Sequence, residues 1–234
     1  MSTIAENLAA VRQRIAEAAW RADRQPKSVT LIAVSKNHTV SAIEEAYAAG
    51  QRDFGENYVQ EAREKYASLP YPDIRWHIIG HMQTNKVRNI LPFTHMVQSL
   101  DSAKLADEIS RRSAQVSFVM PVLIQVSLAH EEQKSGVEPE ELPALIDHVL
   151  SLPNLSVQGL MTMPPLVPAD EARPLFARLR ELRDEMETRF AGVALPVLSM
   201  GMSGDFEEAI AEGATMVRVG TAIFGSREQE VQTR

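Results

Sequence analysis

Eight short apolar runs, separated by longer charged stretches, constrain the fold of this chain more than any other feature. The runs are rich in Val, Ile and Leu and span 29–35, 53–55, 75–80, 95–99, 121–126, 156–162, 196–200 and 216–219. Parallel strands must be joined by long crossovers, usually helices, and the stretches between the runs are long enough to form them. We therefore predict an α/β chain folded as a single-domain (β/α)8 TIM barrel. An open doubly wound sheet is the alternative, because the runs at 53–55 and 196–200 are short.

The charged stretches have helical character. Helices are expected over 41–49, 58–68, 84–90, 103–113, 140–150, 170–190 and 206–212. Residues 1–24 carry Ile4, Leu8, Val11 and Ile15 at helical spacing, which predicts an extra N-terminal helix that packs on the barrel. No Pro/Gly/Ser-rich linker or low-complexity segment interrupts the chain, so residues 1–234 are interpreted as one domain with a tail at 226–234.

Charge and cysteine content exclude several classes of function. The formal net charge is −7, which disfavours a nucleic-acid-binding protein, because neutralising many phosphates needs a concentrated basic face. The chain has no cysteine, which rules out disulfides, thiolate catalysis and cysteine-ligated metals. The charged N-terminus fits neither a signal peptide nor a membrane span, so we expect a cytoplasmic protein without a membrane partner. Because the sequence has no coiled-coil heptads, a monomer is expected.

The first candidate functional residue is Lys36, which directly follows the apolar run at 29–35. Active sites of β/α barrels form at the C-terminal ends of the strands, so this amine is expected at the mouth of the barrel. Apolar walls there would disfavour the charged form of the amine, and a neutral amine can attack an aldehyde. A lone lysine in this position could also be an ordinary solvated loop residue, and its neighbours decide between the two interpretations.

Small residues after the last two apolar runs predict an anion site. The segment LSMGMSGD, at 198–205, places Gly201, Ser203 and Gly204 before the next helix, and Gly220-Thr221 follow the eighth run. Glycines let a ligand approach the backbone, hydroxyls can bind it, and the first N–H groups of a helix are free to donate. Each turn alone could also be explained by the need for a tight backbone turn, without a ligand. Together they lie where β/α barrels commonly bind phosphate.

Arg218 lies between Val217 and Val219 in the last apolar run. Side chains alternate along a strand, so this guanidinium should point away from the two valines and into the barrel mouth. A buried guanidinium needs an acceptor or a counter-charge. The sequence leaves two interpretations open, a contact with a ligand or a structural salt bridge to a strand-end carboxylate such as Glu56.

Two histidines and an asparagine also lie near predicted strand ends. His77 and His81 straddle Gly80, so they should not share the one-face geometry of a helical metal-binding pair, and no metal site is expected. His77, inside an apolar run, is interpreted as a core histidine. His81 and Asn57 could cap loops or line the mouth. The role of Lys134, in a charged loop after the fifth run, stays open.

Several long segments between residues 31 and 225 resemble one known family. They read LIAVSK, FGENYVQE, WHIIGHMQTNK, EEQKSG, GLMTM, LSMGMSGDFEEAI and VRVGTAIFG, in that order. On these segments the chain resembles the pyridoxal phosphate homeostasis protein family, also called the YggS/PROSC family. Several long motifs in order are far more specific than a single glycine pattern. One departure is visible, because Asn37-His38-Thr39 stand where members of the family often carry Thr-Lys-Pro.

The resemblance implies a barrel similar to the N-terminal domain of alanine racemases, with pyridoxal 5′-phosphate (PLP) bound as a Schiff base on Lys36. It also implies that Arg218 faces the pyridine nitrogen of this cofactor. The other implied contacts are Ser203, Gly204, Gly220 and Thr221 around the phosphate, and Asn57, His81 and Met200 near the ring.

Arg218 also bears on the chemistry to expect. Arginine has only donors, so a pyridine nitrogen facing it must be an unprotonated acceptor, and the ring is then a weaker electron sink. The resemblance places the opposing base of the racemases in an additional C-terminal domain, whereas this chain ends at Arg234. We therefore expect storage, buffering or delivery of PLP to PLP-dependent apoenzymes, without catalytic turnover. The alternatives are a racemase-like enzyme with His81 or Tyr58 as second base, and a regulatory protein that reports PLP status.

Overall fold

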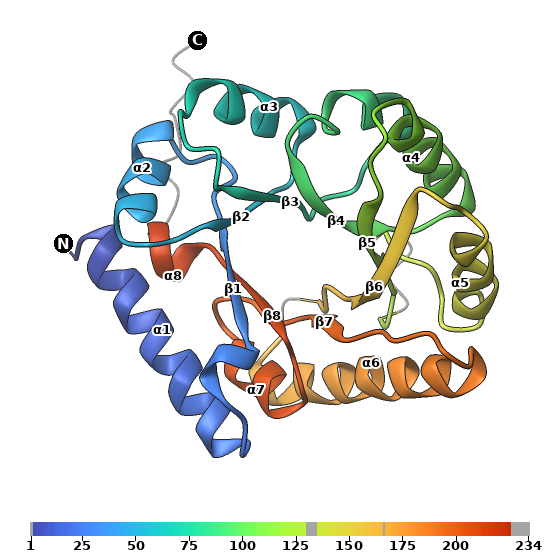
Figure 1. Ribbon diagram of the computed structural model, residues 1–234. Coiled ribbons are helices and arrows are strands. Elements are labelled where there is room, and N and C mark those ends of the chain that lie inside the picture. Colours follow the sequence, from blue (N-terminus) through green and yellow to red (C-terminus); the bar gives the residue numbers. More distant parts are fainter. Residues whose placement is uncertain (1, 130–134, 166, 226–234) are drawn as a thin grey trace, which may run out of the picture.

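The computed structural model describes residues 2–129, 135–165 and 167–225. Eight parallel strands form a closed barrel in sequence order, with β1 paired to both β2 and β8 (Figure 1). The strands are β1 (Thr30–Val34), β2 (Asp53–Glu56), β3 (Arg75–Ile78), β4 (Thr94–Leu100), β5 (Met120–Gln125), β6 (Leu155–Met161), β7 (Val197–Ser199) and β8 (Met216–Val219). The predicted (β/α)8 barrel is confirmed, and the open doubly wound sheet is excluded.

Each predicted apolar run overlaps one strand, and the ends differ by at most two residues. β2 continues through Glu56, one residue beyond the predicted run. Gly55 within β2 has a packing role, because a Cβ atom at this position would lie 2.9 Å from Ile32 Cγ2 and 3.0 Å from Ile79 Cδ1. The missing side chain therefore makes room for two isoleucines from the neighbouring strand regions.

Helices surround the ring of strands (Figure 1). The α-helices are α1 (Ile4–Arg21), α2 (Val40–Ala48), α3 (Val59–Ser68), α4 (Ala103–Gln115), α5 (Leu142–Leu150), α6 (Ala169–Arg189), α7 (Phe206–Ala211) and α8 (Thr221–Phe224). Two short 3-10 helices, η1 (Pro26–Ser28) and η2 (Thr84–Asn89), complete the described elements.

The prediction of a regular helix over 84–90 is wrong in type, because η2 is a 3-10 helix. Val87 is its one buried residue, and its Thr and Asn residues have weak helix propensity. Neither packing nor propensity extends the segment into a full α-helix. The single turn α8 was not predicted at all.

α1 is the expected N-terminal packing helix. It begins with a capping box between Thr3 and Glu6 and buries Leu8, Val11 and Ile15. It packs against α2, α7 and α8, beside the seam where β8 meets β1 (Figure 1). The helix thereby supports the strands that carry the candidate site.

The inside of the barrel is more polar than usual. A large apolar cluster lies between the strands and the helices, and a small one contains Met96, Leu123 and Met161. Branched apolar side chains dominate most β/α barrel interiors. Here Gln98 and Arg218 are also buried, which indicates that the interior has a role beyond packing.

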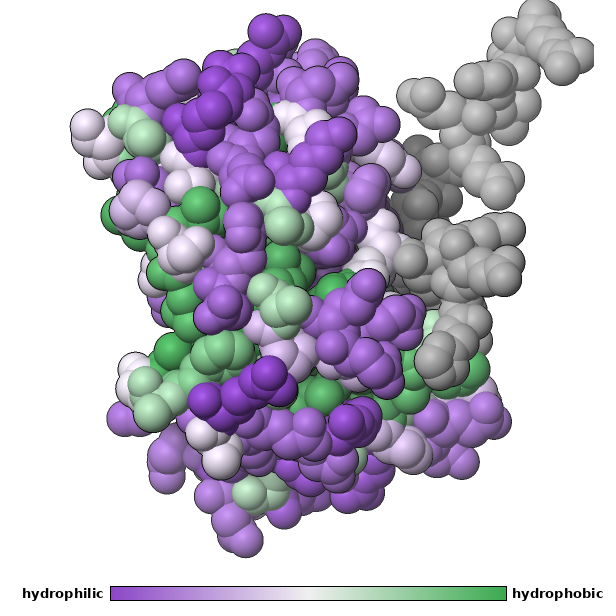
Figure 2. Space-filling view, turned by 90° about the vertical axis from the view of Figure 1, so that its right-hand side faces the viewer, coloured by the Kyte–Doolittle hydropathy of each residue, from purple (hydrophilic) through white to green (hydrophobic). Residues whose placement is uncertain are grey.

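The outer surface is mainly hydrophilic. Figure 2 shows the face over α4 and α5, where hydrophilic residues predominate and hydrophobic ones gather toward the left of the view. Exposed large hydrophobic side chains include Val116, Phe118 and Val119, which follow α4, and Leu150, which ends α5. In the described parts of the chain, no helix combines the length and the apolar character needed to cross a bilayer.

Candidate functional site

Lys36 lies half-buried, two residues after the end of β1. The next residue, Asn37, has φ +60°, a left-handed conformation that asparagine tolerates better than most residues. His38 stacks on Phe224 with ring centroids 4.9 Å apart, and the Thr39 hydroxyl caps α2 by accepting from the N–H of Ala42. The triplet that departs from the family pattern therefore builds the turn that leads from Lys36 into α2.

A cluster of ion-paired side chains contacts the backbone next to Lys36. It consists of Ser35, Glu56, Glu61 and Lys65, and we call it the Lys65 cluster. The Lys65 ammonium donates to the Ser35 carbonyl at 2.6 Å and to Oε1 of Glu56 and of Glu61, each at 2.7 Å. The Ser35 hydroxyl donates to the same Glu56 oxygen at 2.6 Å. These bonds join the end of β1 to β2 and α3.

The Lys65 cluster holds the chain on both sides of Lys36. Ser35 precedes it, and the Asn37 N–H donates to Glu61 Oε1 at 2.5 Å. Lys36 therefore extends from a segment whose two neighbouring residues are fixed. We infer that the cluster limits the positions that the Lys36 amine can reach.

Glu56 is the most buried acid of this region. Burial raises the pKa of its carboxyl, and the nearby Lys65 charge opposes this shift. Its Oε1 atom accepts two bonds, whereas Oε2 has no hydrogen-bond partner in the described part of the chain. The suggested salt bridge between Arg218 and Glu56 is wrong, because Glu56 pairs with Lys65 instead.

Arg218 points into the barrel, as alternation along β8 predicts. Its side chain is almost fully buried and donates to the Ser199 hydroxyl at 2.7 Å and to the Thr162 carbonyl at 2.8 Å. Burial lowers the pKa of Arg218 to about 10, and the charge of Asp205 opposes this shift, so the guanidinium stays positive at neutral pH. Within the described residues it forms no ion pair with a carboxylate, which leaves a buried, donor-only cation facing the barrel interior.

The predicted phosphate residues come together at two adjoining turns. The Ser203 hydroxyl accepts from the Gly220 N–H at 3.3 Å and from the Ala222 N–H at 3.4 Å, which joins the turn after β7 to the start of α8. Gly204 faces open space, since a Cβ atom there would meet nothing within 4 Å. Thr221 is exposed as the first residue of α8.

The residues that the resemblance places near the cofactor ring lie farther apart in the chain than the phosphate residues do. Gly80 packs so closely that a Cβ atom there would overlap the backbone of Asn57, which fixes the turn after β2. His81 is exposed and hydrogen-bonded to Asp101 at 3.2 Å. Met200 is fully buried within the large apolar cluster. Contacts of Asn57, His81 and Met200 with a ring stay predictions, and Lys134 and the tail at 226–234 lie outside the described residues.

His77 is a buried core histidine, as expected. Its Nε2 atom lies 3.1 Å from Asp53 Oδ1, and Arg75 also binds the Asp53 carboxylate. Desolvation raises the pKa of Asp53, but hydrogen bonds from His77 and Arg75 outweigh it and lower the pKa from 3.8 to about 2. Asp53 and Arg75 are the first residues of β2 and β3, at the opposite end of the barrel from Lys36, and His77 is the third residue of β3.

Asp53 is expected to make folding acid-sensitive. Because its pKa is lower in the folded chain, its contribution is complete above about pH 4 and is lost as pH falls toward 2. The shift corresponds to about 2 kcal/mol. Urea unfolding of Asp53→Asn should show this loss at pH 7 and a flatter pH dependence between 4 and 2 than the parent chain. Asp73→Asn, which removes an exposed ion-paired carboxylate, is the control and should change little. Parallel curves for parent and Asp53→Asn would contradict the assignment.

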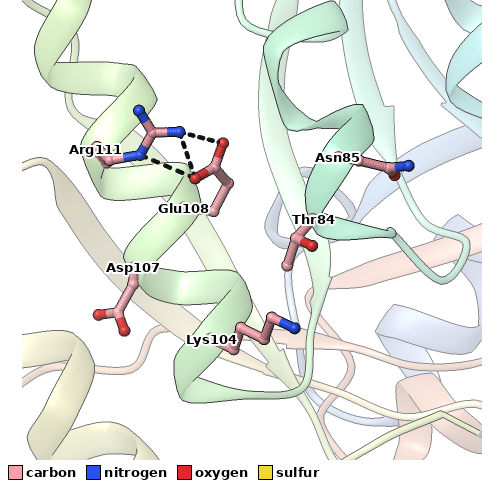
Figure 3. A pocket seen from close by; sticks show the side chains of 6 residues that line it. All are labelled: Thr84, Asn85, Lys104, Asp107, Glu108 and Arg111. Carbon is pink, nitrogen blue, oxygen red and sulfur yellow. Dashed lines mark hydrogen bonds and ion pairs between the residues drawn. The ribbon is translucent and has the colours of Figure 1, made fainter.

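Two hollows in the surface, one along α6 and one between η2 and α4, suit a phosphate ligand poorly. One, of about 550 Å³, runs along α6 and is lined by Glu181, Asp184, Glu185 and Thr188. Its three carboxylates would repel an anion. Another, of about 340 Å³, lies between η2 and α4 (Figure 3). There the Arg111 guanidinium is turned onto Glu108, which leaves Lys104 as the main cation of the lining (Figure 3).

Sequence reasoning missed the residues that support the site. They are Ser35, Glu61, Lys65, Gln98, Thr162 and Ser199, and the pairing of Glu56 with Lys65 was also not foreseen. One signal was present, because Glu61 and Lys65 are four residues apart on a predicted helix and Lys65 shares a face with the buried Ala62. For Gln98 and Ser199, the sequence holds no comparable local signal.

Comparisons with known proteins agree with this architecture. The family model described as alanine racemase, N-terminal domain, matches residues 6–228. The chain is 48% identical over 224 residues to the pyridoxal phosphate homeostasis protein of Aquifex aeolicus, covering 95% of this chain and 98% of the relative. It is also 48% identical over 229 residues to the protein of the same name from Pseudomonas aeruginosa, covering 97% of each.

Solved structures show the same fold. PipY of Synechococcus elongatus PCC7942, with PLP bound, matches with a TM-score of 0.86 and 41% identity over 95% of this chain and 100% of that chain. D-threonine aldolase of Filomicrobium marinum matches with a TM-score of 0.71 at 18% identity, over 96% of this chain and 64% of that chain, which shows the fold alone. From the family model and the near full-length relatives, the chain belongs to the pyridoxal phosphate homeostasis protein family, whose barrel is of the alanine racemase N-terminal type.

Proposed function

We propose that this chain binds PLP as a Schiff base on Lys36 and holds it in the cytoplasm, as a monomer, for delivery to PLP-dependent apoenzymes. The relatives named for PLP homeostasis and the PLP-bound PipY support the choice of ligand. The observation that carries the proposal is a lysine at the end of β1 that is fixed on both sides, in a barrel whose interior holds a buried arginine without a carboxylate partner in the described chain.

The described residues fit PLP at three points. The phosphate needs donors, and the joined turns of Ser203 and Gly220 offer hydroxyl and backbone groups beside an open glycine. The pyridine nitrogen needs a donor if it is unprotonated, and Arg218 is a donor that stays charged. The aldehyde needs an amine, which Lys36 supplies.

The cofactor, when bound, supplies an aldehyde that condenses reversibly with amines and a ring that can withdraw electrons. The chain's own residues orient these groups. The Lys65 cluster limits the reach of the Lys36 amine, and the Arg218 guanidinium, shielded from water, disfavours a proton on the ring nitrogen because like charges repel. The arrangement therefore favours reversible attachment over strong electron withdrawal.

The positions of the candidate second bases also favour a carrier over a racemase-like enzyme. A general base must lie within hydrogen-bond reach of the proton that it removes. The Tyr58 side chain is 60% exposed, and His81 is exposed and bonded to Asp101. The Tyr58 side chain therefore lies largely in solvent and the His81 ring is turned to Asp101, which favours neither residue as the second base.

Borohydride reduction of the protein incubated with PLP tests the anchor, because reduction converts a labile Schiff base into a permanent tag. Peptide mass mapping should find one tag on the peptide containing Lys36. The Lys36→Ala variant should lose the tag completely, since the Lys65 ammonium, which also lies at the end of β1, is buried and paired with Glu56 and Glu61. Lys104→Ala, which removes an exposed lysine from the groove of Figure 3, should keep it. Tags scattered over several lysines, or none, would refute the proposal.

Turnover assays separate the carrier from the enzyme. The wild-type protein with bound PLP should racemise a panel of L-amino acids no faster than free PLP does. Racemisation above that rate, abolished in Lys36→Ala, would favour the racemase-like alternative.

A further inference from the structure

A line of side-chain hydrogen bonds crosses the barrel interior from Arg218 to Asp53. Arg218 Nη1 lies 2.7 Å from Ser199 Oγ, and Ser199 Oγ lies 2.7 Å from Gln98 Oε1. Gln98 Nε2 lies 3.1 Å from His77 Nδ1, and His77 Nε2 lies 3.1 Å from Asp53 Oδ1. We call these five residues the interior network.

One link of the interior network crosses the barrel, whereas its other links join neighbouring strands. Gln98 belongs to β4, whereas Ser199 belongs to β7, and these strands are not adjacent in the barrel. Ser199, Gln98 and His77 are each 0% exposed. The network therefore links the arginine on β8 to the opposite rim, where Arg75 neutralises Asp53.

Every donor in the interior network points the same way. Arg218 has only donors, so the Ser199 oxygen must accept, and the single Ser199 hydrogen goes to Gln98 Oε1. The amide nitrogen of Gln98 then donates to His77 Nδ1, which leaves the His77 proton on Nε2, facing Asp53. All four hydrogen bonds can therefore form at once with a single arrangement of protons, from the Arg218 cation to the Asp53 anion.

We propose that Ser199 and Gln98 are positioning residues that aim Arg218 at the pyridine nitrogen of the cofactor, with His77 and Asp53 fixing the orientation of the Gln98 amide. Arginine has a long, flexible side chain, and the described residues anchor this one only through Ser199 and Thr162. Without its acceptor on Gln98, the Ser199 hydroxyl would no longer be fixed in one rotamer, and its oxygen would hold the Arg218 guanidinium less firmly in one direction. The inference rests on the proposed function, because it concerns how that same site controls the cofactor.

The pH titration of the bound cofactor's absorbance provides the test, because protonation of its Schiff base changes the spectrum. A poorly aimed Arg218 would let the ring nitrogen take up a proton, and this added positive charge lowers the pKa of the Schiff base. Gln98→Leu should therefore titrate about one pH unit lower than the parent, the scale of one hydrogen bond to a charged group. PLP should also dissociate more readily from this variant.

Two further variants make the test specific. Gln125→Leu removes another buried glutamine, on β5, which donates to the Ser135 carbonyl and lies outside the interior network. The pH titration of the cofactor's absorbance in Gln125→Leu should match that of the parent protein. Ser199→Ala, a smaller change, should shift the titration in the same direction as Gln98→Leu, and the double variant should shift no further than the larger single effect.

The outcomes separate this inference from the proposed function. A parent protein that carries no tag on Lys36 after reduction would overturn both. A tagged parent combined with unshifted titrations of Gln98→Leu and Ser199→Ala would overturn the positioning role alone. Equal shifts in Gln98→Leu and Gln125→Leu would also overturn it, because any buried cavity would then have the same effect.

Discussion

Replacing Lys65 by methionine is expected to lower the free energy of unfolding by about 3–5 kcal/mol. The Lys65 side chain is 6% exposed and pairs with Glu56, whose side chain is 0% exposed and has one oxygen without a partner among the described residues. Methionine fills a similar volume but leaves the Glu56 charge without compensation. Urea denaturation at pH 7 measures the loss.

The same variant should disturb cofactor attachment. Without Lys65, the Ser35 carbonyl loses a donor and Glu61 loses the cation that holds it beside the Asn37 N–H. The rate of Schiff-base formation should fall, even though Lys36 itself is intact. Adding Glu56→Gln to Lys65→Met removes the uncompensated charge and should restore much of the stability. A single variant as stable as the parent would show that the ion pair contributes nothing.

The barrel could be predicted because its determinants are local. Each strand is marked by an apolar run, and the alternation of Arg218 with Val217 and Val219 placed its side chain inside the barrel correctly. The turn at Ser203 and Gly204 is indicated by its small residues, because glycine and serine are typical of tight turns. Such features can be identified within a few residues of sequence.

The support of the site could not be predicted, because it depends on pairs that are distant in sequence. Lys65 and Ser35 are 30 residues apart, and Gln98 and Ser199 are 101 residues apart on strands that are not neighbours. Patterning identifies which side chains point inward, but it does not say which of them meet. The sequence therefore leaves Glu56 open as a partner of Arg218, whereas in the structure its partner is Lys65.

The two ends of the candidate site are therefore built differently. At the Lys36 end, an ion-pair cluster fixes the backbone, whereas at the Arg218 end a chain of neutral side chains carries orientation from one charge to another. Loss of a charge should mainly reduce stability, and loss of a neutral link should mainly change the spectrum of a bound cofactor. The turn at Ser203 depends neither on the Lys65 cluster nor on the interior network, because the left-handed backbone of Gly201 sets its shape.

Gly201→Ala is expected to lower the free energy of unfolding by about 2–4 kcal/mol and to weaken PLP binding. Gly201 has φ +90°, and a Cβ atom there would lie 2.6 Å from Ala209 Cβ and 2.9 Å from Phe206 Cα. α7 would have to move away, and the nearby Ser203 turn would separate from Gly220. Thermal unfolding and PLP titration measure the two effects.

Gly192→Ala is the matched control for this substitution. Gly192 has φ +85°, but a Cβ atom there would meet nothing within 4 Å. It should therefore show only the conformational cost of a left-handed alanine, about 1 kcal/mol, with PLP affinity unchanged. If Gly201→Ala were no more destabilising than Gly192→Ala, the close approach of α7 would not constrain the phosphate turn. A larger loss in Gly201→Ala, together with weaker PLP binding, would show that this contact shapes the site.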